Sequence, residues 1–204
     1  MKSQQQPLLE SDPSVRRAFD YYPTPAWMTR ALLRRMPALT FSQVLEPCAG
    51  DGAIVGVLRE AGAIVDTNDL DPSRETDWHL DATRDESWAS FRSPTWTITN
   101  VPFNLADQIV PLAVKHSRRG VATILRLSWL EPTADRADFL KEHPPDRLLV
   151  LPRHDFKGRG STDSVTSAWF IWDHARHLAP QGIEIVTKAE RDELISLARE
   201  TQDS

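Results

Sequence analysis

The chain has 204 residues, 40% of them hydrophobic, and this length supports one domain with a sizeable core but excludes two ordinary domains with a linker. Its formal net charge of −5 argues against a protein that coats nucleic acid non-specifically, and its single cysteine, Cys48, excludes a disulfide framework and a thiol-based metal site. Since no stretch approaches the roughly 20 apolar residues of a membrane span and the N-terminus lacks the apolar core of a signal peptide, we expect a cytoplasmic protein that binds no membrane.

The chain begins with a polar arm and a helix. Its first 14 residues are polar and interrupted by proline, which predicts a flexible arm at residues 1–14 and a single domain at residues 15–204. From Pro25 to Met36 the apolar residues follow helical spacing, so we expect a helix there. Thr24 is the expected N-cap of this helix, with Pro25 as its first residue.

Beyond Pro37, short β-like runs alternate with helical stretches, which is the pattern of an α/β fold. Strands are expected at Gln43 to Pro47, Ala63 to Asn68, Thr95 to Asn100, Val121 to Leu127, Arg147 to Leu151 and Ala168 to Trp172, with a weaker seventh strand near Trp78 to Asp81. Helices are expected at Ala53 to Ala61, Leu105 to Ser117 and Thr133 to Glu142, and an amphipathic helix at Lys188 to Arg199 is expected to close the domain. Trp169, Phe170 and Trp172 are interpreted as core residues of their strand.

A loop of small residues follows the first predicted strand, in the segment VLEPCAGDG from Val44 to Gly52. Gly50 and Gly52 allow a tight turn and a close approach of a ligand, and the helix that starts there offers unpaired N–H groups. Asp69 ends the next strand, nineteen residues after Gly50, where a carboxylate can accept hydrogen bonds from both ribose hydroxyls of an adenosine cofactor. NAD fits this spacing as well as a methyl donor does, and Asp71 is an alternative for the ribose contact.

The strand that ends at Asn100 runs into Asn100-Val101-Pro102-Phe103. This tetrapeptide is similar to the Asn/Asp-Pro-Pro-Tyr/Phe motif of the class I S-adenosylmethionine-dependent methyltransferases that act on amino nitrogens. Within them, the chain from about Tyr21 to Asp173 resembles the phage-type adenine-specific DNA methyltransferases. The resemblance implies a single doubly wound Rossmann-like methyltransferase sandwich, mostly parallel with an antiparallel strand near the C-terminus. It also implies S-adenosylmethionine as cofactor, no metal, and methyl transfer to the amino group of adenine in DNA.

The chemistry explains the residue types of the tetrapeptide. An exocyclic amino nitrogen is a poor nucleophile because its lone pair is delocalised into the ring, and two acceptors on its hydrogens favour a more reactive geometry. The side-chain oxygen of Asn100 and the carbonyl of Val101 are the candidate acceptors, and Phe103 would stack on the flipped base. Val101 stands where the family has its first proline, so it keeps the carbonyl but loosens the backbone that aims it.

Further segments resemble the same family. The stretch from Tyr21 to Pro25 is similar to its N-terminal cofactor element, Tyr-x-Thr-Pro, whose threonine region holds the methionine end of the donor. Asp81 resembles the acidic residue that binds the amino group of the cofactor adenine, with Asp77 and Asp85 as alternatives. By this resemblance the cofactor-binding residues are Tyr22, Thr24, Pro25, Glu46, Pro47, Gly50, Gly52, Asp69 and Asp81.

Basic residues gather in two places. We interpret Lys115, His116, Arg118 and Arg119 as a solvated surface. In the loop from Arg153 to Ser164, Arg153, Lys157 and Arg159 are expected to contact nucleic-acid phosphates.

Other functions stay open at this point. The same tetrapeptide occurs in methyltransferases that act on RNA or on protein glutamine, and a chain of this length leaves little room for a DNA-recognition region. A catalytically degenerate cofactor-binding module for nucleic acid or assembly is the second alternative, and Val101 is the feature that keeps it open.

Overall fold

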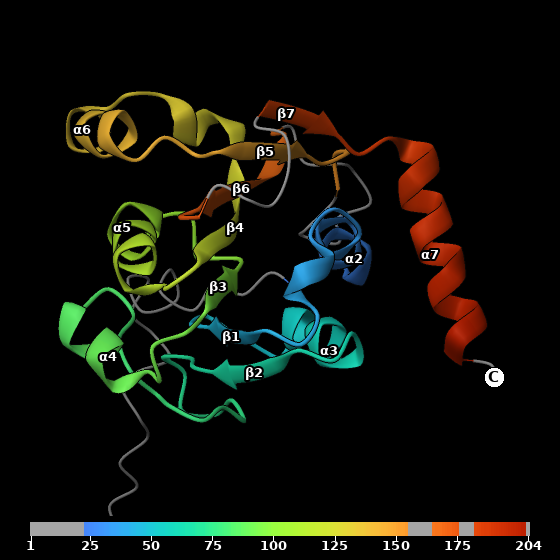
Figure 1. The fold of residues 1–204 in the computed structure, drawn as a ribbon, viewed down its shortest axis with the longest axis horizontal. Helices are drawn as coiled ribbons and strands as arrows, with labels where there is room; N and C mark the ends of the chain where they lie inside the picture. The colour runs from blue at the N-terminus through green and yellow to red at the C-terminus, as the bar shows by residue number, and fades with distance from the viewer. Residues whose placement is uncertain (1–22, 155–164, 176–181, 203–204) are drawn as a thin grey trace, which may run out of the picture.

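The structure centres on one mixed sheet. The computed structural model describes residues 23–154, 165–175 and 182–202, and the expected arm at residues 1–14 lies outside them. Seven strands form the sheet in the order β2-β1-β3-β4-β6-β5-β7 (Figure 1). They are β1 (Gln43–Glu46), β2 (Ile64–Thr67), β3 (Trp96–Thr99), β4 (Gly120–Arg126), β5 (Arg147–Val150), β6 (Ser167–Asp173) and β7 (Gly182–Ile185).

All the pairings in this sheet are parallel except those of one strand. β1 pairs in parallel with β2 and β3, and β3 pairs in parallel with β4. β6 runs antiparallel to both β4 and β5, while β5 and β7 are parallel. The expected mostly parallel sheet with an antiparallel strand near the C-terminus is therefore confirmed. Because β1 to β4 run in one direction, the loops that follow them meet at the same edge of the sheet.

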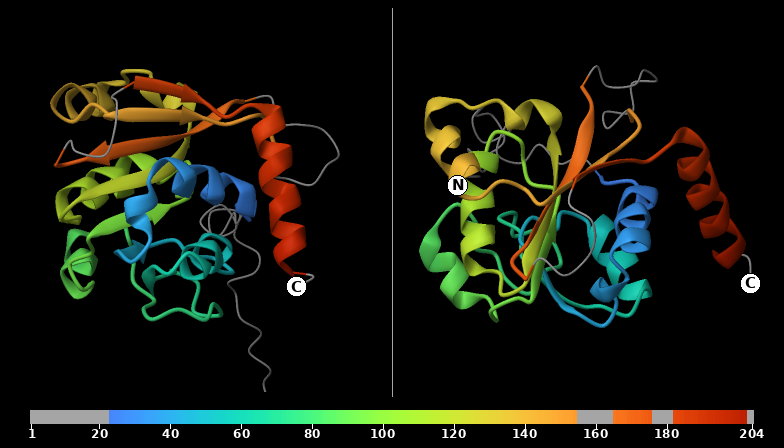
Figure 2. Two further views of the ribbon diagram at one scale, coloured as in Figure 1. Left: turned by 45° about the vertical axis from the view of Figure 1, so that its right-hand side comes forward. Right: turned by 45° about the horizontal axis from the view of Figure 1, so that its top comes forward.

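Helices cover both faces of the sheet, as the edge-on view in Figure 2 shows. The helices are α2 (Ala26–Arg35) and α3 (Ala53–Glu60) on one face, and α4 (Asp85–Ser90), α5 (Ala106–His116) and α6 (Ala134–Glu142) on the other. A buried apolar cluster lies on each face, which is the doubly wound arrangement predicted from the sequence. The C-terminal helix α7 (Lys188–Gln202) packs beside α2, where Arg34 pairs with Glu193 and Arg35 with Glu190.

Strand β6 lies in the centre of the core, and each of its residues is buried. The indole Nε1 of Trp169 donates a hydrogen bond of 2.9 Å to the carbonyl of Met28, which ties β6 to α2. At the start of the neighbouring β4, a Cβ added to Gly120 would lie 2.1 Å from the carbonyl oxygen of Trp172, so only glycine fits there. The interpretation of Trp169, Phe170 and Trp172 as core residues is confirmed.

The expected strand near Trp78 to Asp81 is wrong. Only one parallel bridge forms there, between Asn68 and Trp78, because side chains take the place of a strand ladder. Asp77 accepts hydrogen bonds from the Thr67 backbone, and Leu80 donates to the Asn68 side chain. The seventh strand is β7 instead, which the sequence analysis missed, together with the short helix α4.

The expected cap of the first helix is also wrong. Helix α2 begins at Ala26, its N-cap is Pro25, and no side chain caps it. Thr24 lies one residue too early for this role, and its hydroxyl oxygen accepts a hydrogen bond from Asn100 instead. Of the two roles expected for Thr24, the helix cap is therefore excluded, and its contact with Asn100 joins the expected donor-binding segment to the tetrapeptide after β3.

Candidate functional site

The glycine loop between β1 and α3 lies at the edge where the parallel strands end. Gly50 and Gly52 have φ angles of 56° and 81°, in the left-handed region that favours glycine. Gly52 is also the N-cap of α3, so the helix starts with its free N–H groups directed toward this edge. The backbone requirement predicted for both glycines is confirmed.

Asp69 contacts the glycine loop directly. Its Oδ2 accepts a hydrogen bond of 2.7 Å from the Gly50 N–H, and its Oδ1 accepts one of 2.9 Å from the Asp71 N–H. Each carboxylate oxygen retains a further lone pair, so Asp69 can also accept hydroxyl donors. Asp71 turns to its own loop, where hydrogen bonds from Ser73 lower the pKa of its carboxyl. The structure brings Asp69 to the glycine loop and leaves Asp71 outside it.

Asn68 is a buried residue of this site that the sequence analysis missed. Its Nδ2 donates to the carbonyl oxygens of Pro47 and Leu80 at 2.9 and 3.0 Å, and its Oδ1 accepts from the Leu80 N–H at 2.8 Å. These bonds hold the segment that leads to Asp81 against the loop after β1. An asparagine directly before an acidic residue at a strand end was the available signal.

Asp81 lies at the end of the segment that Asn68 holds. Its Oδ1 accepts hydrogen bonds from the N–H and hydroxyl of Thr83, at 3.0 and 2.6 Å. Burial raises the pKa of Asp81, but these bonds and the pairing with Arg84 outweigh it, so the pKa stays below its ordinary value. The carboxylate is therefore charged at neutral pH.

The two alternatives to Asp81 lie elsewhere. Asp77 accepts hydrogen bonds of 2.8 Å from both the N–H and the hydroxyl of Thr67, so it serves to anchor its loop to β2. Asp85 is exposed and pairs with Lys115 and His116 at the C-terminal end of α5. Neither carboxylate reaches the glycine loop by these contacts.

Glu46 is a buried carboxyl at the end of β1, with 1% of its surface exposed. Its Oε1 accepts a hydrogen bond of 3.2 Å from the Cys48 N–H, whereas Oε2 has no partner in the described part of the chain. Burial raises the pKa of the carboxyl to about 8. An orphaned buried carboxyl beside the glycine loop fits a positively charged group of a ligand. Burial also raises the pKa of the Cys48 thiol well above its ordinary value, which favours its neutral form.

Asn100 joins the end of β3 to the segment before α2. Its Nδ2 donates a hydrogen bond of 3.0 Å to Oγ1 of Thr24, which is itself buried. This bond uses the amide N–H side of Asn100 and leaves Oδ1 to accept. The side chain of Val101 is buried in the cluster on the α5 face, with 2% of its surface exposed. Apolar packing therefore anchors the tetrapeptide at the position where the family motif has a proline.

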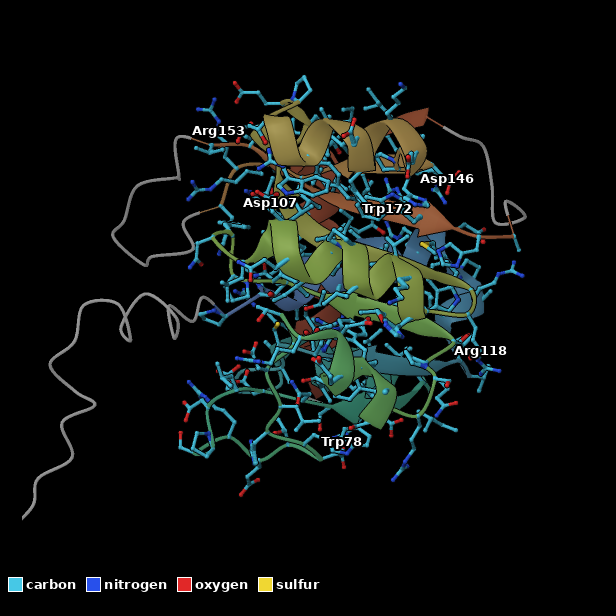
Figure 3. The ribbon with its side chains drawn as sticks, turned by 90° about the vertical axis from the view of Figure 1, so that its left-hand side faces the viewer. Trp78, Asp107, Arg118, Asp146, Arg153 and Trp172 are labelled. Atoms are coloured by element: carbon cyan, nitrogen blue, oxygen red, sulfur yellow. The ribbon has the colours of Figure 1, made fainter. Side chains whose placement is uncertain are left out.

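Phe103 and the loop basic residues complete the predicted set. Phe103 is half-buried, and the guanidinium carbon of Arg126 lies 4.7 Å from its ring centroid. Arg153 is exposed and lies toward the same end of the molecule as Asp107 at the start of α5, as Figure 3 shows. Tyr22, Lys157 and Arg159 lie outside the described residues.

The first basic cluster lies away from this site. Figure 3 shows Arg118 at the opposite end of the molecule from Arg153. Lys115 and His116 pair with Asp85, and Arg119 pairs with Asp173. The interpretation of this cluster as ordinary surface agrees with these contacts.

No cluster of histidine, cysteine, aspartate or glutamate side chains suited to a metal ion occurs in the described ranges. Within the same ranges, no helix combines the length and apolar character needed to cross a membrane.

The chain resembles known proteins in its three-dimensional structure. No protein-family model and no curated protein sequence matches the chain. A class I S-adenosylmethionine-dependent methyltransferase from Listeria monocytogenes aligns with a TM-score of 0.58 and 12% identity, over 86% of this chain and 69% of the other. A modification subunit of a type I restriction enzyme from Vibrio vulnificus aligns with a TM-score of 0.60 and 12% identity, over 92% and 55%. An RNA methyltransferase from Pyrococcus horikoshii aligns with a TM-score of 0.58 and 15% identity, over 80% and 90%.

These likenesses show that the chain has the fold of class I methyltransferases. The chain spans about half the length of the Vibrio subunit, at 55% of it. The fold is common to a protein named as a modification subunit of a restriction enzyme and to one named as an RNA methyltransferase, so it leaves the acceptor open.

Proposed function

We propose that the protein binds S-adenosylmethionine and transfers its methyl group to the exocyclic amino group of adenine in DNA. The hydrogen bond between Thr24 and Asn100 is the observation that carries the proposal. It joins the proposed donor-binding segment before α2 to the proposed acceptor motif after β3. A methyl transfer needs these two segments within reach of one another, because the donor carbon and the acceptor nitrogen must meet in line.

The residues around the glycine loop fit the parts of this donor. Asp69 would accept hydrogen bonds from the ribose hydroxyls while it also accepts one from the Gly50 N–H. Asp81 would accept a hydrogen bond from the adenine amino group. The buried Oε2 of Glu46 would accept a hydrogen bond from the ammonium group at the methionine end of the donor. The cofactor supplies an electrophilic methyl group on a sulfonium, and the protein supplies acceptors for its polar ends.

The acceptor side follows from the amide of Asn100. With Nδ2 held by Thr24, Oδ1 and the Val101 carbonyl would accept the two hydrogens of the target amino group. The N–C bond forms as the C–S bond of the donor breaks, and the nitrogen then loses one proton to solvent. No general base needs to act before attack, because the nitrogen loses its proton only after the new bond has formed.

DNA is the acceptor that the resemblance of the tetrapeptide favours, and the likeness to a restriction-modification subunit supports it. An RNA acceptor is the main alternative because of the likeness to an RNA methyltransferase. The test is incubation with labelled donor and, separately, adenine-containing duplex DNA, single-stranded DNA, RNA and protein, followed by nucleoside and amino-acid analysis. N6-methyladenosine would move the acceptor to RNA, and methylated glutamine would move it to protein. Donor binding without any transfer would favour the degenerate module.

A further inference from the structure

Three arginines of the described residues stack on aromatic rings, and one of them differs from the other two. Arg92 lies 5.6 Å from the Trp78 ring and pairs with Asp66 at 3.5 Å. Arg136 lies 5.2 Å from the Trp129 ring and forms a two-point pair with Asp107. Both guanidinium groups are thus neutralised by a carboxylate.

Among the residues that the structure describes, no carboxylate pairs with Arg126. Its guanidinium carbon lies 4.7 Å from the Phe103 ring centroid, and within the described ranges it neither donates a hydrogen bond nor forms an ion pair. The side chain is exposed. Stacking fixes the plane of the guanidinium and leaves its N–H groups at the edges, where they are available to an anion.

The position of Arg126 places this cation beside the acceptor motif. It is the last residue of β4, and β4 pairs with β3 through Thr99 and Thr123. Arg126 therefore lies three residues beyond the end of that pairing, and Phe103 lies beyond the end of β3. Because the two strands are parallel, both residues lie at the same edge of the sheet. On its other side Arg126 is in register with Ser167, whose carbonyl accepts from the Leu151 N–H.

We propose that Arg126 binds a backbone phosphate of the acceptor strand, next to the nucleotide whose base stacks on Phe103. The inference rests on the proposed function, since it requires a nucleic-acid acceptor. A planar guanidinium with unused N–H groups matches the geometry of phosphate oxygens. In a chain with a net charge of −5, such a contact must come from a local cation of this kind.

The experiment measures binding of a short fluorescein-labelled adenine-containing duplex by anisotropy, at several salt concentrations and with S-adenosylhomocysteine present. Arg126→Ala is expected to bind about tenfold more weakly at 0.1 M salt, because one phosphate contact contributes about 0.9 to the slope of log K against log salt. The slope should become shallower by about that amount. Arg126→Lys keeps the charge and should keep the slope. Arg199→Ala, which removes a charge from the far end of α7, is the matched control and should bind as the wild type does.

Three results would contradict the inference, and only one of them would also contradict the proposed function. Equal affinity and slope for wild type and Arg126→Ala would overturn the inference and leave the proposed function intact. Weaker binding with an unchanged slope would assign Arg126 to the base and overturn the phosphate contact. Failure of the wild type to bind any DNA or RNA, although it binds S-adenosylhomocysteine, would overturn both proposals. Thermal unfolding of each variant checks that the fold survives.

Discussion

The hydroxyl of Thr24 and the side-chain amide of Asn100 are joined by a hydrogen bond of 3.0 Å across 76 residues of sequence. Thr24 lies just before α2, and Asn100 lies just after β3. Their contact cannot be predicted from the residues next to either of them. The bond fixes which side of the Asn100 amide faces outward. It makes the geometry of the proposed acceptor site depend on the segment before α2.

Loss of this bond should impair transfer more than donor binding. In Thr24→Val the shape is kept but the Asn100 N–H loses its acceptor, so the amide can rotate and Oδ1 is no longer aimed. We expect a fall in the single-turnover rate of about tenfold or more. Thr24→Ser retains the hydroxyl and should retain most of the rate. Equal rates for the valine and serine variants would show that the bond has no part in catalysis.

Replacement of Asp69 should weaken donor binding. Asp69→Ala removes the proposed ribose acceptor and also releases the Gly50 N–H, so we expect a loss of about 1 to 3 kcal/mol for S-adenosylhomocysteine. Titration calorimetry measures it. Asp71→Ala is the matched control, because this carboxylate turns to Ser73 and should leave the affinity unchanged. The opposite order of effects would assign the ribose contact to Asp71.

The buried carboxyl of Glu46 predicts a pH dependence of stability. Its pKa of about 8 in the folded chain exceeds that of an exposed glutamate, so between the two values the folded state holds a proton that the unfolded state has lost. The free energy of unfolding of the ligand-free protein should therefore fall as the pH rises from about 4.5 toward 8. This component should vanish in Glu46→Gln. Denaturant titrations at several pH values test it, and identical pH slopes for the two proteins would show that Glu46 keeps an ordinary pKa.

The same group predicts how donor binding responds to pH. An ammonium group is attracted by the ionised form of Glu46, so the affinity for S-adenosylhomocysteine should rise as the pH increases toward 8. In Glu46→Gln the affinity should be lower and should lose this rise. Calorimetry in buffers of different ionisation enthalpy would also detect the proton released on binding. A flat affinity profile in the wild type would remove Glu46 from the donor site.

Substitution of Val101 by proline tests whether the departure from the family motif limits the enzyme. The Val101 side chain lies in the core cluster, so proline exchanges some apolar packing for a fixed backbone. We expect Val101→Pro to fold and to transfer methyl at the wild-type rate or faster. Single-turnover rates together with a melting curve decide it. Activity in the variant alone, with an inactive wild type, would support the degenerate module.

The alternation of elements and the glycine loop could be predicted because their determinants are local. Gly50 and Gly52 adopt the left-handed angles that only glycine adopts readily, and six strands lie where apolar runs predicted them. Strand β7 was missed although Ile183 and Ile185 alternate with Glu184, a pattern too short to stand out; both isoleucines are exposed in the fold, and the strand pairs with β5. The strand expected near Trp78 does not form, because hydrogen bonds to side chains such as that of Asn68 replace the backbone pairing that a strand would need.

The candidate site was predictable in its residue types but not in its contacts. The sequence favoured Asp81 over Asp77 and Asp85 for one role only by resemblance, and the contacts of the folded chain separate the three carboxylates: Asp77 holds Thr67, Asp81 holds Thr83, and Asp85 pairs with Lys115. The roles of Asn68 and Arg126 depend on segments that the fold brings together, Pro47 in one case and Phe103 in the other. Thr24 was expected both as a helix cap and, by resemblance, in the donor-binding segment, but its contact with the distant Asn100 cannot be predicted from neighbouring residues.

The proposed role of Asn100 in methyl transfer is tested by the single-turnover rate on adenine-containing DNA, measured for the wild type and for Asn100→Ala. Asn100 is half-buried and its amide contacts Thr24, so the variant should fold and retain most of its affinity for S-adenosylhomocysteine, which calorimetry checks separately. We expect N6-methyladenine from the wild type and a rate lower by about a hundredfold or more in the variant, because the lost interaction matters chiefly as the transition state forms. Undiminished transfer by Asn100→Ala would contradict this role.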